Sequence, residues 1–332
     1  MIIKPRGIPR KLAALASLVS RLPDSAASMQ KVKSDYKMSR AGFAGELKVD
    51  KFLEELELQR PHYIIHDLDI KIGTKKVQID TILFHPNFIL LMEIKNMRGE
   101  FYFDPKNRQF FRVNDNGKKE GMRNPEAQVN RAIKAINTFL CSKGYDGVAE
   151  GIIVLVSRAG IVMNAPERWK TIPLDSLTEF IEALERQTSS VFTDDICKKL
   201  ALSLLDEDRS EAMSGLTTYY AVSEKDVIRG VRCPECHQIP MERKHSRWSC
   251  TRCGAECRNA HLGSLQEYRL LFGPEITSRH AKEFFQNESM NFTIRVLNKS
   301  AVPKAGKVRY RLFHISEKLT YLEGFVNKEM KQ

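Results

Sequence analysis

The sequence predicts an α/β protein in which one larger domain is followed by two smaller modules. Three observations lead to this prediction. With 332 residues the chain is long enough for two or three domains. Helical and strand-like runs alternate over residues 38–206, which is typical of a small α/β domain. Beyond that region, five of the seven cysteines cluster over 233–257, and the tail after them has helical and strand-like patterns of its own.

The larger domain is expected to begin with a helix over 40–58, where apolar side chains recur at spacings of three and four residues. Five strand-like runs follow, at 63–70, 75–84, 88–94, 99–103 and 109–113. Asn124-Pro125 is suited to a helix start and predicts a helix over 126–140. The remaining elements are a buried strand and two helices, at 151–156, 177–187 and 194–205.

This organisation predicts five segments. They are an N-terminal helical extension, the α/β domain, a polar linker, a cysteine module and a C-terminal domain, at 1–37, 38–206, 207–230, 231–260 and 264–332. The apolar run at 12–19 is too short for a membrane span and lacks the longer apolar core of a secretory signal. We therefore expect a cytoplasmic protein with no membrane partner.

The positive charge of the chain is concentrated toward its C-terminus. The formal net charge is +12, and from residue 225 onward there are 20 Lys and Arg against 11 Asp and Glu. A basic segment of this kind indicates a polyanionic partner, most simply nucleic acid. The alternative is a solubilising surface with no specific partner.

A cluster of charged residues on two neighbouring strand-like runs is the strongest functional signal. Asp80 lies in one run, and Glu93-Ile94-Lys95 ends the next. Alternation along a strand places Glu93 and Lys95 on the same face. Unpaired charges are costly to bury, so their position among apolar residues indicates that a cation binds there. The alternative is that each is an ordinary solvated surface residue.

Two carboxylates with a lysine beside them suit the metal-dependent hydrolysis of a phosphodiester. Mg²⁺ prefers oxygen ligands and keeps several waters, so Asp80, Glu93 and the main-chain carbonyl of Ile94 would suffice to hold Mg²⁺ or Mn²⁺. Such an ion would activate a water molecule and neutralise charge on the transition state. Lys95 would orient or polarise that water.

The α/β domain resembles the nuclease-related domain (NERD), a branch of the PD-(D/E)xK endonuclease-like superfamily. The resemblance covers about 41–140 and continues more weakly to about 184. Its motifs occur in the order AGFAGE at 41–46, QID at 78–80, MEIKN at 92–96, Gly99, and NPEAQ at 124–128. Ile79 stands where the superfamily's name has proline, a departure that many of its branches share.

The resemblance implies a restriction-endonuclease-like core, with a mixed central sheet flanked by helices, and Mg²⁺-dependent endonuclease activity on DNA. It implies that Glu46 completes the acidic site directly or through water. It also implies that Gln128 positions Lys95 or the substrate, and we expect Asn96 and Arg98 to contact phosphate. A fold of this kind can persist after catalysis is lost, but all four charged residues of the motif are present in this chain.

Two CxxC pairs indicate a structural zinc site. Cys233 and Cys236 are followed, after thirteen residues, by Cys250 and Cys253. Four thiolates close a tetrahedral site and leave no open position, as in a zinc ribbon, and we expect 244–248 to form one of its strands. Free cysteines without metal are the alternative. The spare donors that could replace a cysteine are His237, His245, His261 and Cys257.

The C-terminal tail predicts a winged helix-turn-helix. Helices are expected over 276–285 and 290–297, with a break at 286–289, and 304–311 is expected to form a turn into a basic strand. A small domain for protein contacts is the alternative. The residues expected to contact nucleic acid here are Arg295, Lys299, Lys304, Lys307, Arg309 and Arg311.

The leading hypothesis is a DNA nuclease whose zinc ribbon and winged-helix-like tail deliver DNA to a Mg²⁺ site. The main competing hypothesis is a non-catalytic DNA-binding or regulatory protein, which the low charge of the first 224 residues favours, since they carry only +3. A third hypothesis is an RNA-processing nuclease, because the same metal site would cleave RNA.

Overall fold

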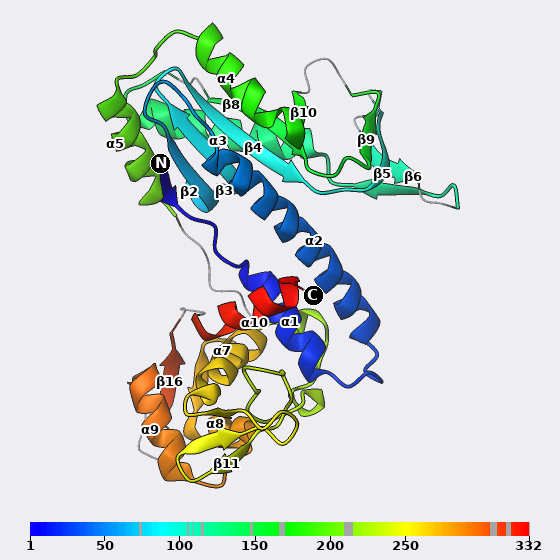
Figure 1. The fold of residues 1–332 in the computed structure, drawn as a ribbon, viewed down its shortest axis with the longest axis vertical. Coiled ribbons are helices and arrows are strands. Elements are labelled where there is room, and N and C mark those ends of the chain that lie inside the picture. Colours follow the sequence, from blue (N-terminus) through cyan, green and yellow to red (C-terminus); the bar gives the residue numbers. More distant parts are fainter. Residues whose placement is uncertain are drawn as a thin grey trace. The chain divides into compact units, whose positions relative to one another are not determined.

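The computed structural model divides the chain into two compact units (Figure 1). The first unit comprises Met1–Gly7 and Ala41–Glu211, and the second comprises Ile8–Arg40 and Ala212–Gln332. The structure describes residues 1–72, 75–104, 106–107, 109–113, 116–146, 149–165, 170–208, 215–305, 311–316 and 320–331. The five segments expected from the sequence stay a proposal; by its contacts the chain forms these two units.

A six-stranded mixed sheet is the centre of the first unit, with strand order β1-β2-β3-β4-β8-β10. The strands β2, β3 and β4 form an antiparallel meander, whereas β1, β8 and β10 pair in parallel with their neighbours. The bounds are Ile2–Lys4 (β1), Tyr63–Ile72 (β2), Lys75–His85 (β3), Phe88–Lys95 (β4), Ala149–Leu155 (β8) and Thr171–Pro173 (β10).

Helices cover both faces of this sheet because its strands are apolar on both sides. On one face lie α3 and α5, which contribute to two buried hydrophobic clusters through Val129, Ala132 and Ile136 of α3 and Leu200 of α5. On the other face, α2 and α4 pack against Ile64 and Leu90. The helices are α2 (Met29–Glu54), α3 (Pro125–Ser142), α4 (Leu177–Gln187) and α5 (Asp194–Leu205), with a 3₁₀ turn at Leu174–Ser176. This is the mixed central sheet flanked by helices that the resemblance described above implies.

A second sheet, of four strands, extends the first unit beyond β4. Its order is β7-β6-β5-β9, and it comprises Gly99–Asp104 (β5), Gln109–Val113 (β6), Lys119–Met122 (β7) and Gly160–Met163 (β9). Phe101, Phe103 and Phe110 pack its inner face against Val129 and Ile153. The strands β7 and β9 were not predicted.

The predicted start of the first helix is wrong. The helix was expected over 40–58, but α2 runs from Met29 to Glu54, so the AGFAGE motif lies inside the helix rather than at its start. The N-terminal extension is also not wholly helical. Ile2–Lys4 forms β1 and pairs in parallel with β2, so the first residues belong to the sheet of the first unit.

The second unit is built around α7 (Ala260–Phe272), which packs against α1 (Arg10–Arg21), α8 (Ser278–Phe285) and α10 (Thr320–Lys331). Glu267 of α7 is fully buried, as is Arg21, and it accepts hydrogen bonds from Arg21 and from Arg232 Nε at 2.7 Å. Breaking one partner of such a buried ionic group is strongly destabilising. Two short helical elements, Leu216–Tyr219 (α6) and Glu224–Asp226, precede the cysteine region.

The cysteine region folds into a three-stranded antiparallel sheet, β11-β12-β13. Its strands are Glu242–Lys244 (β11), Arg247–Ser249 (β12) and Glu256–Cys257 (β13). The expectation of one strand over 244–248 is wrong, because His245 and Ser246 form the turn of a hairpin and His245 has φ 50°. The hairpin itself agrees with a ribbon-like module.

The C-terminal elements have the order of a winged helix-turn-helix: α7, β14, α8, α9, β15, β16, with sheet order β14-β16-β15. The bounds are Glu275–Thr277 (β14), Ser278–Phe285 (α8), Met290–Ser300 (α9), Ala301–Ala305 (β15) and Leu312–Ile315 (β16). The predicted break at 286–289 is confirmed, and Thr277 caps α8 by accepting from the amide of His280 at 3.1 Å. Residues 306–310 of the expected basic strand lie outside the described residues.

Within the described parts of the chain, no helix combines the length and the apolar character needed to cross a bilayer.

Candidate active site and metal centre

Asp80 lies where the pairing between β2 and β3 is interrupted. The register passes from His66↔Thr81 to Leu68↔Ile79 and leaves Asp80 out of the pairing, opposite Asp67, whose φ is 47°. A positive φ is uncommon outside glycine and marks a strained position. The interruption also shifts by one residue the alternation of side chains between the two faces of β3. Ile79 and Ile82, which are three positions apart, therefore belong to the same buried cluster. Asp80 is thereby turned toward the neighbouring strand β4.

The Asp80 carboxylate contacts the main chain of β4 directly. Its Oδ2 accepts a hydrogen bond from the Ile94 amide at 2.8 Å. A residue in an extended strand directs its N–H and C=O to the same side, so the Ile94 carbonyl also faces the strand that carries Asp80. The register Thr81↔Met92, extended by one residue, sets Asp80 opposite Glu93.

Glu93 and Lys95 lie on one face of β4, as the sequence predicts. Lys95 Nζ is 2.5 Å from Glu93 Oε1, and the Glu93 residue is only 7% exposed. Leu91 belongs to the core cluster on the α3 side of the sheet and Met92 to the cluster on the α2 side. By alternation, Glu93 and Lys95 therefore lie on the α3 side.

Burial governs the electrostatics of the two acids. It raises the pKa of Glu93 to about 7, and the charge of Asp80 adds to this, whereas Lys95 and Arg131 oppose it. Burial also raises the pKa of Asp80, although the Ile94 amide and the charges of Lys95 and Arg6 act in the other direction. Two buried carboxylates that are this close favour either protonation or a bound cation.

Arg6, in the N-terminal segment, contacts the candidate site. Nothing in the sequence indicated that Arg6 belongs to this site. Its guanidinium makes a bidentate pair with Asp50, at 2.8 and 3.0 Å, and reaches Glu46 Oε2 at 3.0 Å. It also donates to the Asp80 carbonyl at 3.0 Å and to Thr81 Oγ1 at 2.8 Å. A contact between residue 6 and residues 46 to 81 has no local sequence signal.

Glu46 lies beside Asp80 but on the α2 side of the sheet. Burial raises its pKa to about 7, with Arg6 lowering it and Asp80 raising it. The charge of Asp80 raises the pKa of both Glu46 and Glu93. Glu46 and Glu93 therefore lie on either side of Asp80. Among the described residues, these three carboxylates do not gather into one compact ligand group.

The second helix of the motif, α3, places cations and an amide near Glu93. Gln128 is half-buried and makes no hydrogen bond to the described residues, so it contacts neither Lys95 nor Glu93 in this way. Arg131, one turn further along, is exposed and lowers the pKa of Glu93 through its charge. Arg131 was not predicted; its spacing of three residues from Gln128 is the only signal that could have found it.

Asn96 has a structural contact that sequence analysis did not foresee. Its Nδ2 donates to the Ala41 carbonyl of α2 at 2.7 Å. A Cβ on Gly45 would lie 2.5 Å from the Cβ of Asn96, so only glycine allows this close approach. The AGFAGE motif at 41–46 and the MEIKN motif at 92–96 are therefore in contact. Arg98, two residues after Asn96, is exposed.

A family model described as "Nuclease-related domain" (NERD) matches residues 41–156. These residues form a nuclease-related domain. The match starts at Ala41, whose carbonyl holds Asn96, and includes Glu46, Asp80, Glu93, Lys95 and Gln128. No curated protein and no solved structure matches the chain.

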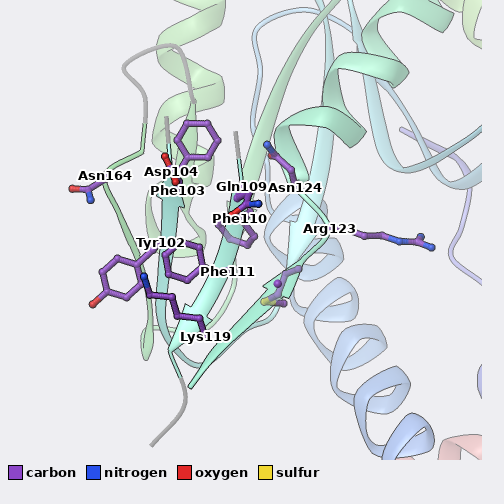
Figure 2. A pocket seen from close by; sticks show the side chains of 12 residues that line it. Tyr102, Phe103, Asp104, Gln109, Phe110, Phe111, Lys119, Arg123, Asn124 and Asn164 are labelled. Atoms are coloured by element: carbon purple, nitrogen blue, oxygen red, sulfur yellow. The ribbon is translucent and has the colours of Figure 1, made fainter. Parts of the chain in front are cut away.

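The four-stranded sheet of the first unit carries a hollow of about 920 Å³ (Figure 2). Tyr102 and Phe111 stack there with ring centroids 5.6 Å apart, and Lys119 Nζ lies 5.0 Å from the Phe111 ring. Figure 2 shows these three side chains together on one side of the strands. Aromatic rings beside a cation form a surface on which unpaired bases can stack.

Four cysteines of the second unit converge on one point. The Sγ atoms of Cys233, Cys236, Cys250 and Cys253 all lie within 4.8 Å of one another. Cys236 and Cys250 are 3.4 Å apart, and Cys233 and Cys253 are 3.7 Å apart. Thiolates about 2.3 Å from a zinc ion lie about 3.8 Å from each other in a tetrahedron, so the donor set fits zinc. Cys257, on β13, stands outside this group.

The residues expected to contact nucleic acid in the tail are only partly described. Arg295 and Lys299 are exposed on α9, and Arg311 is half-buried just before β16. The placement of Lys304 within β15 is described but not that of its side chain, and Lys307 and Arg309 lie outside the described residues.

Proposed function

We propose that this chain is a metal-dependent nuclease that hydrolyses phosphodiester bonds in DNA. The observation that carries the proposal is the placement of Asp80 and Glu93 opposite each other on β3 and β4, with Lys95 on the same face as Glu93. The nuclease-related domain that contains them supports it. The proposed ions are Mg²⁺ or Mn²⁺ at the acids and structural Zn²⁺ at the four cysteines.

The donor set at the acids fits a hard divalent cation. Asp80 and Glu93 supply two carboxylates, and the Ile94 carbonyl faces the same strand edge. A cation bound there would relieve the burial that raises the pKa of Glu93 to about 7 and would supply an activated water and charge neutralisation. Lys95, now 2.5 Å from Glu93, would then be released to orient the attacking water.

Other residues of this chain would position the substrate and the acids. Arg131 and Arg98 are exposed cations at the α3 side and after β4, where they would contact phosphate oxygens. Gln128 has no hydrogen-bond partner among the described residues and is available for Lys95 or for the substrate. Glu46, held by Arg6, would act on the site through Asp80 or through water.

The experiment that tests the proposal is cleavage of plasmid DNA with Mg²⁺ and without it. The wild type should nick or cut the plasmid, whereas Asp80→Asn and Lys95→Met should each lose most of the activity. Asp146→Asn is the matched control, because Asp146 lies in the same domain, is exposed after α3 and does not line the hollow of the four-stranded sheet. Equal cleavage by the wild type and both site variants would refute the catalytic proposal.

Substrate class is tested in the same assay. Plasmid, single-stranded DNA and structured RNA are compared in parallel, and the proposal expects DNA to be cleaved in preference to RNA. Preferential cleavage of RNA would support the RNA-processing alternative instead. Binding of DNA with no cleavage of any substrate would support a non-catalytic DNA-binding protein.

A further inference from the structure

A cavity of about 700 Å³ lies within the second unit, between the cysteine hairpin, α7 and α9. Arg243, Arg258, Arg295 and Lys299 line it, together with the histidines His245 and His261, and none of the described residues that line it is acidic. This cavity is separate from the acids of the nuclease-related domain. Its walls come from the β11–β12 hairpin, from α7 and α9, and from the end of β16 and the start of α10.

The four cations of the cavity differ from other arginines of the same unit. Arg21 and Arg232 are paired with Glu267, and Arg247 is paired with Glu256 at 3.0 Å. Arg243, Arg258, Arg295 and Lys299 make no ion pair with any residue that the structure describes. Like charges that gather without a counter-charge repel one another, so an anion that binds among them would relieve this repulsion.

Arg243 shows this imbalance most directly. Its guanidinium lies 3.8 Å from the Phe292 ring centroid and 5.2 Å from that of Trp248. The ring contacts fix the guanidinium in place, yet its Nη1 is buried and has no hydrogen-bond partner among the described residues. A buried donor left without an acceptor is unfavourable, because it has lost its hydrogen bonds to water and gained none in return. An oxyanion in the cavity would supply that acceptor.

His261 adds a neutral donor to the same cavity. The residue is 7% exposed, and its Nδ1 accepts from Trp248 Nε1 at 3.1 Å. A histidine that accepts at Nδ1 carries its proton at Nε2, and among the described residues nothing accepts from Nε2. His261 stands in the first turn of α7, a helix of 13 residues with no acidic side chain in that turn. The amide groups of such a helix start favour anions.

We propose that this cavity binds a phosphate group of a nucleic-acid strand. Cations on α9 and after β13 would make charge-assisted hydrogen bonds to the phosphate oxygens, and Arg243 Nη1 and His261 Nε2 would complete them. The proposal rests on nucleic acid being the substrate of the proposed function, but not on catalysis. The phosphate would belong either to a strand terminus or to the backbone.

Binding of fluorescent oligonucleotides tests this in the Asp80→Asn background, so that no cleavage occurs. The test variant is Arg258→Gln/Lys299→Gln, since both side chains are exposed and their replacement leaves the core intact. The matched control is Lys225→Gln/Lys282→Gln, which removes the same charge from the same unit outside the cavity. Zinc content and thermal unfolding establish that both double variants are folded.

The cavity variant should bind about tenfold more weakly, and the slope of log affinity against log salt should fall by about two, one for each of the two cations that no longer bind phosphate. The control should keep the salt slope of the parent. A weaker affinity seen only with 5′-phosphorylated strands assigns the cavity to a strand terminus, and an equal weakening with 5′-hydroxyl strands assigns it to the backbone. Equal losses of affinity in the cavity and control variants would overturn the proposal.

The binding test and the plasmid cleavage assay together separate this proposal from the nuclease proposal. If the wild type cleaves no substrate but affinity still depends on Arg258 and Lys299, catalysis is refuted and the phosphate cavity stands. If the wild type cleaves DNA and the cavity variant binds like the control, the cavity proposal fails alone.

Discussion

The guanidinium of Arg6 donates to Glu46 at 3.0 Å and to both carboxylate oxygens of Asp50, and it also reaches the carbonyl of Asp80. The Arg6 side chain is only 2% exposed. One arginine from the start of the chain thus neutralises two carboxylates on α2 and contacts the strand that carries the central acid. The N-terminal segment is therefore part of the candidate active site.

Replacing Arg6 with methionine should destabilise the first unit by about 3 kcal/mol, because it leaves two mostly buried carboxylates without their cation. The pKa of Glu46, which Arg6 lowers, should rise further above about 7. Urea denaturation at neutral pH measures the loss of stability. Nuclease activity should also fall, since Asp80 loses the hydrogen bond to its carbonyl.

Lys4→Met is the control for that substitution. Lys4 pairs with Asp208 at 2.7 Å and also donates to the Asp67 carbonyl, but its side chain is partly exposed, so its removal should cost only about 1 kcal/mol. Similar losses of stability in the two variants would show that Arg6 makes no special contribution.

The sequence predicted those parts of the fold whose signal is local. The strand-like run at 88–94 and the helices at 177–187 and 194–205 agree with β4, α4 and α5 to within a residue. The strand is an almost uninterrupted apolar run, and the two helices have apolar residues at spacings of three and four. The shared face of Glu93 and Lys95 was predictable for the same reason, because alternation along one strand determines it; their ion pair was not predicted.

What the sequence could not predict depends on distant contacts. The first twelve residues of α2, from Met29 to Arg40, are mostly polar, and their buried apolar members Met29 and Val32 are too few to give a helical stripe. The contacts of Arg6 join residues 40 or more positions apart. The pairing between β2 and β3 is interrupted at Asp67 and Asp80, where Asp67 has a positive φ. An aspartate in the sequence does not by itself predict a positive φ.

Gly45→Ala should weaken the packing between α2 and the loop after β4. Its new Cβ would lie 2.5 Å from Asn96 Cβ, and Asn96 is held by its hydrogen bond to Ala41. Forcing an extra carbon into such a space costs about 1–3 kcal/mol. Thermal or urea unfolding measures this cost, and the displaced Asn96 should also lower nuclease activity.

Gly42→Ala is the matched control within the same helix, because no other side chain lies within 4 Å of the position that a Cβ would take there. Alanine is the better helix former, so this variant should gain up to about 1 kcal/mol. A loss of stability in Gly42→Ala as large as in Gly45→Ala would contradict the close approach seen at Asn96.

Cys250→Ser should abolish the zinc site. Cys250 is buried, its Sγ lies 3.4 Å from that of Cys236, and amide groups of Arg252 and Cys253 offset its burial and lower its pKa to about 7, which favours the thiolate. The wild type should contain one zinc per chain by elemental analysis, whereas the variant should contain none and should lose the β11–β13 sheet. Cys257→Ser should keep its zinc, and equal zinc content in all three proteins would disprove the four-cysteine assignment.

Stability of the second unit should fall in acid because of His261. Burial lowers the pKa of His261 to about 4, with the charge of Arg243 acting in the same direction, against an ordinary value of 6.5. Above pH 6.5 both folded and unfolded chains hold this histidine neutral, so it adds no pH dependence. Between pH 6.5 and about 4 only the unfolded chain takes up the proton, so the free energy of unfolding should decrease with falling pH.

His261→Asn isolates this contribution, since an amide oxygen can still accept from Trp248 Nε1 but cannot be protonated in this range. Unfolding is followed by the fluorescence of Trp248, in a background where Trp169, the other of the two tryptophans, is phenylalanine. The parent should lose stability more steeply than His261→Asn as the pH falls from 6.5 toward 4. His66, whose pKa burial also lowers to about 4, is present in both proteins and cancels in the comparison. Parallel stability curves for the two proteins would show that His261 is not held in its neutral form by the fold.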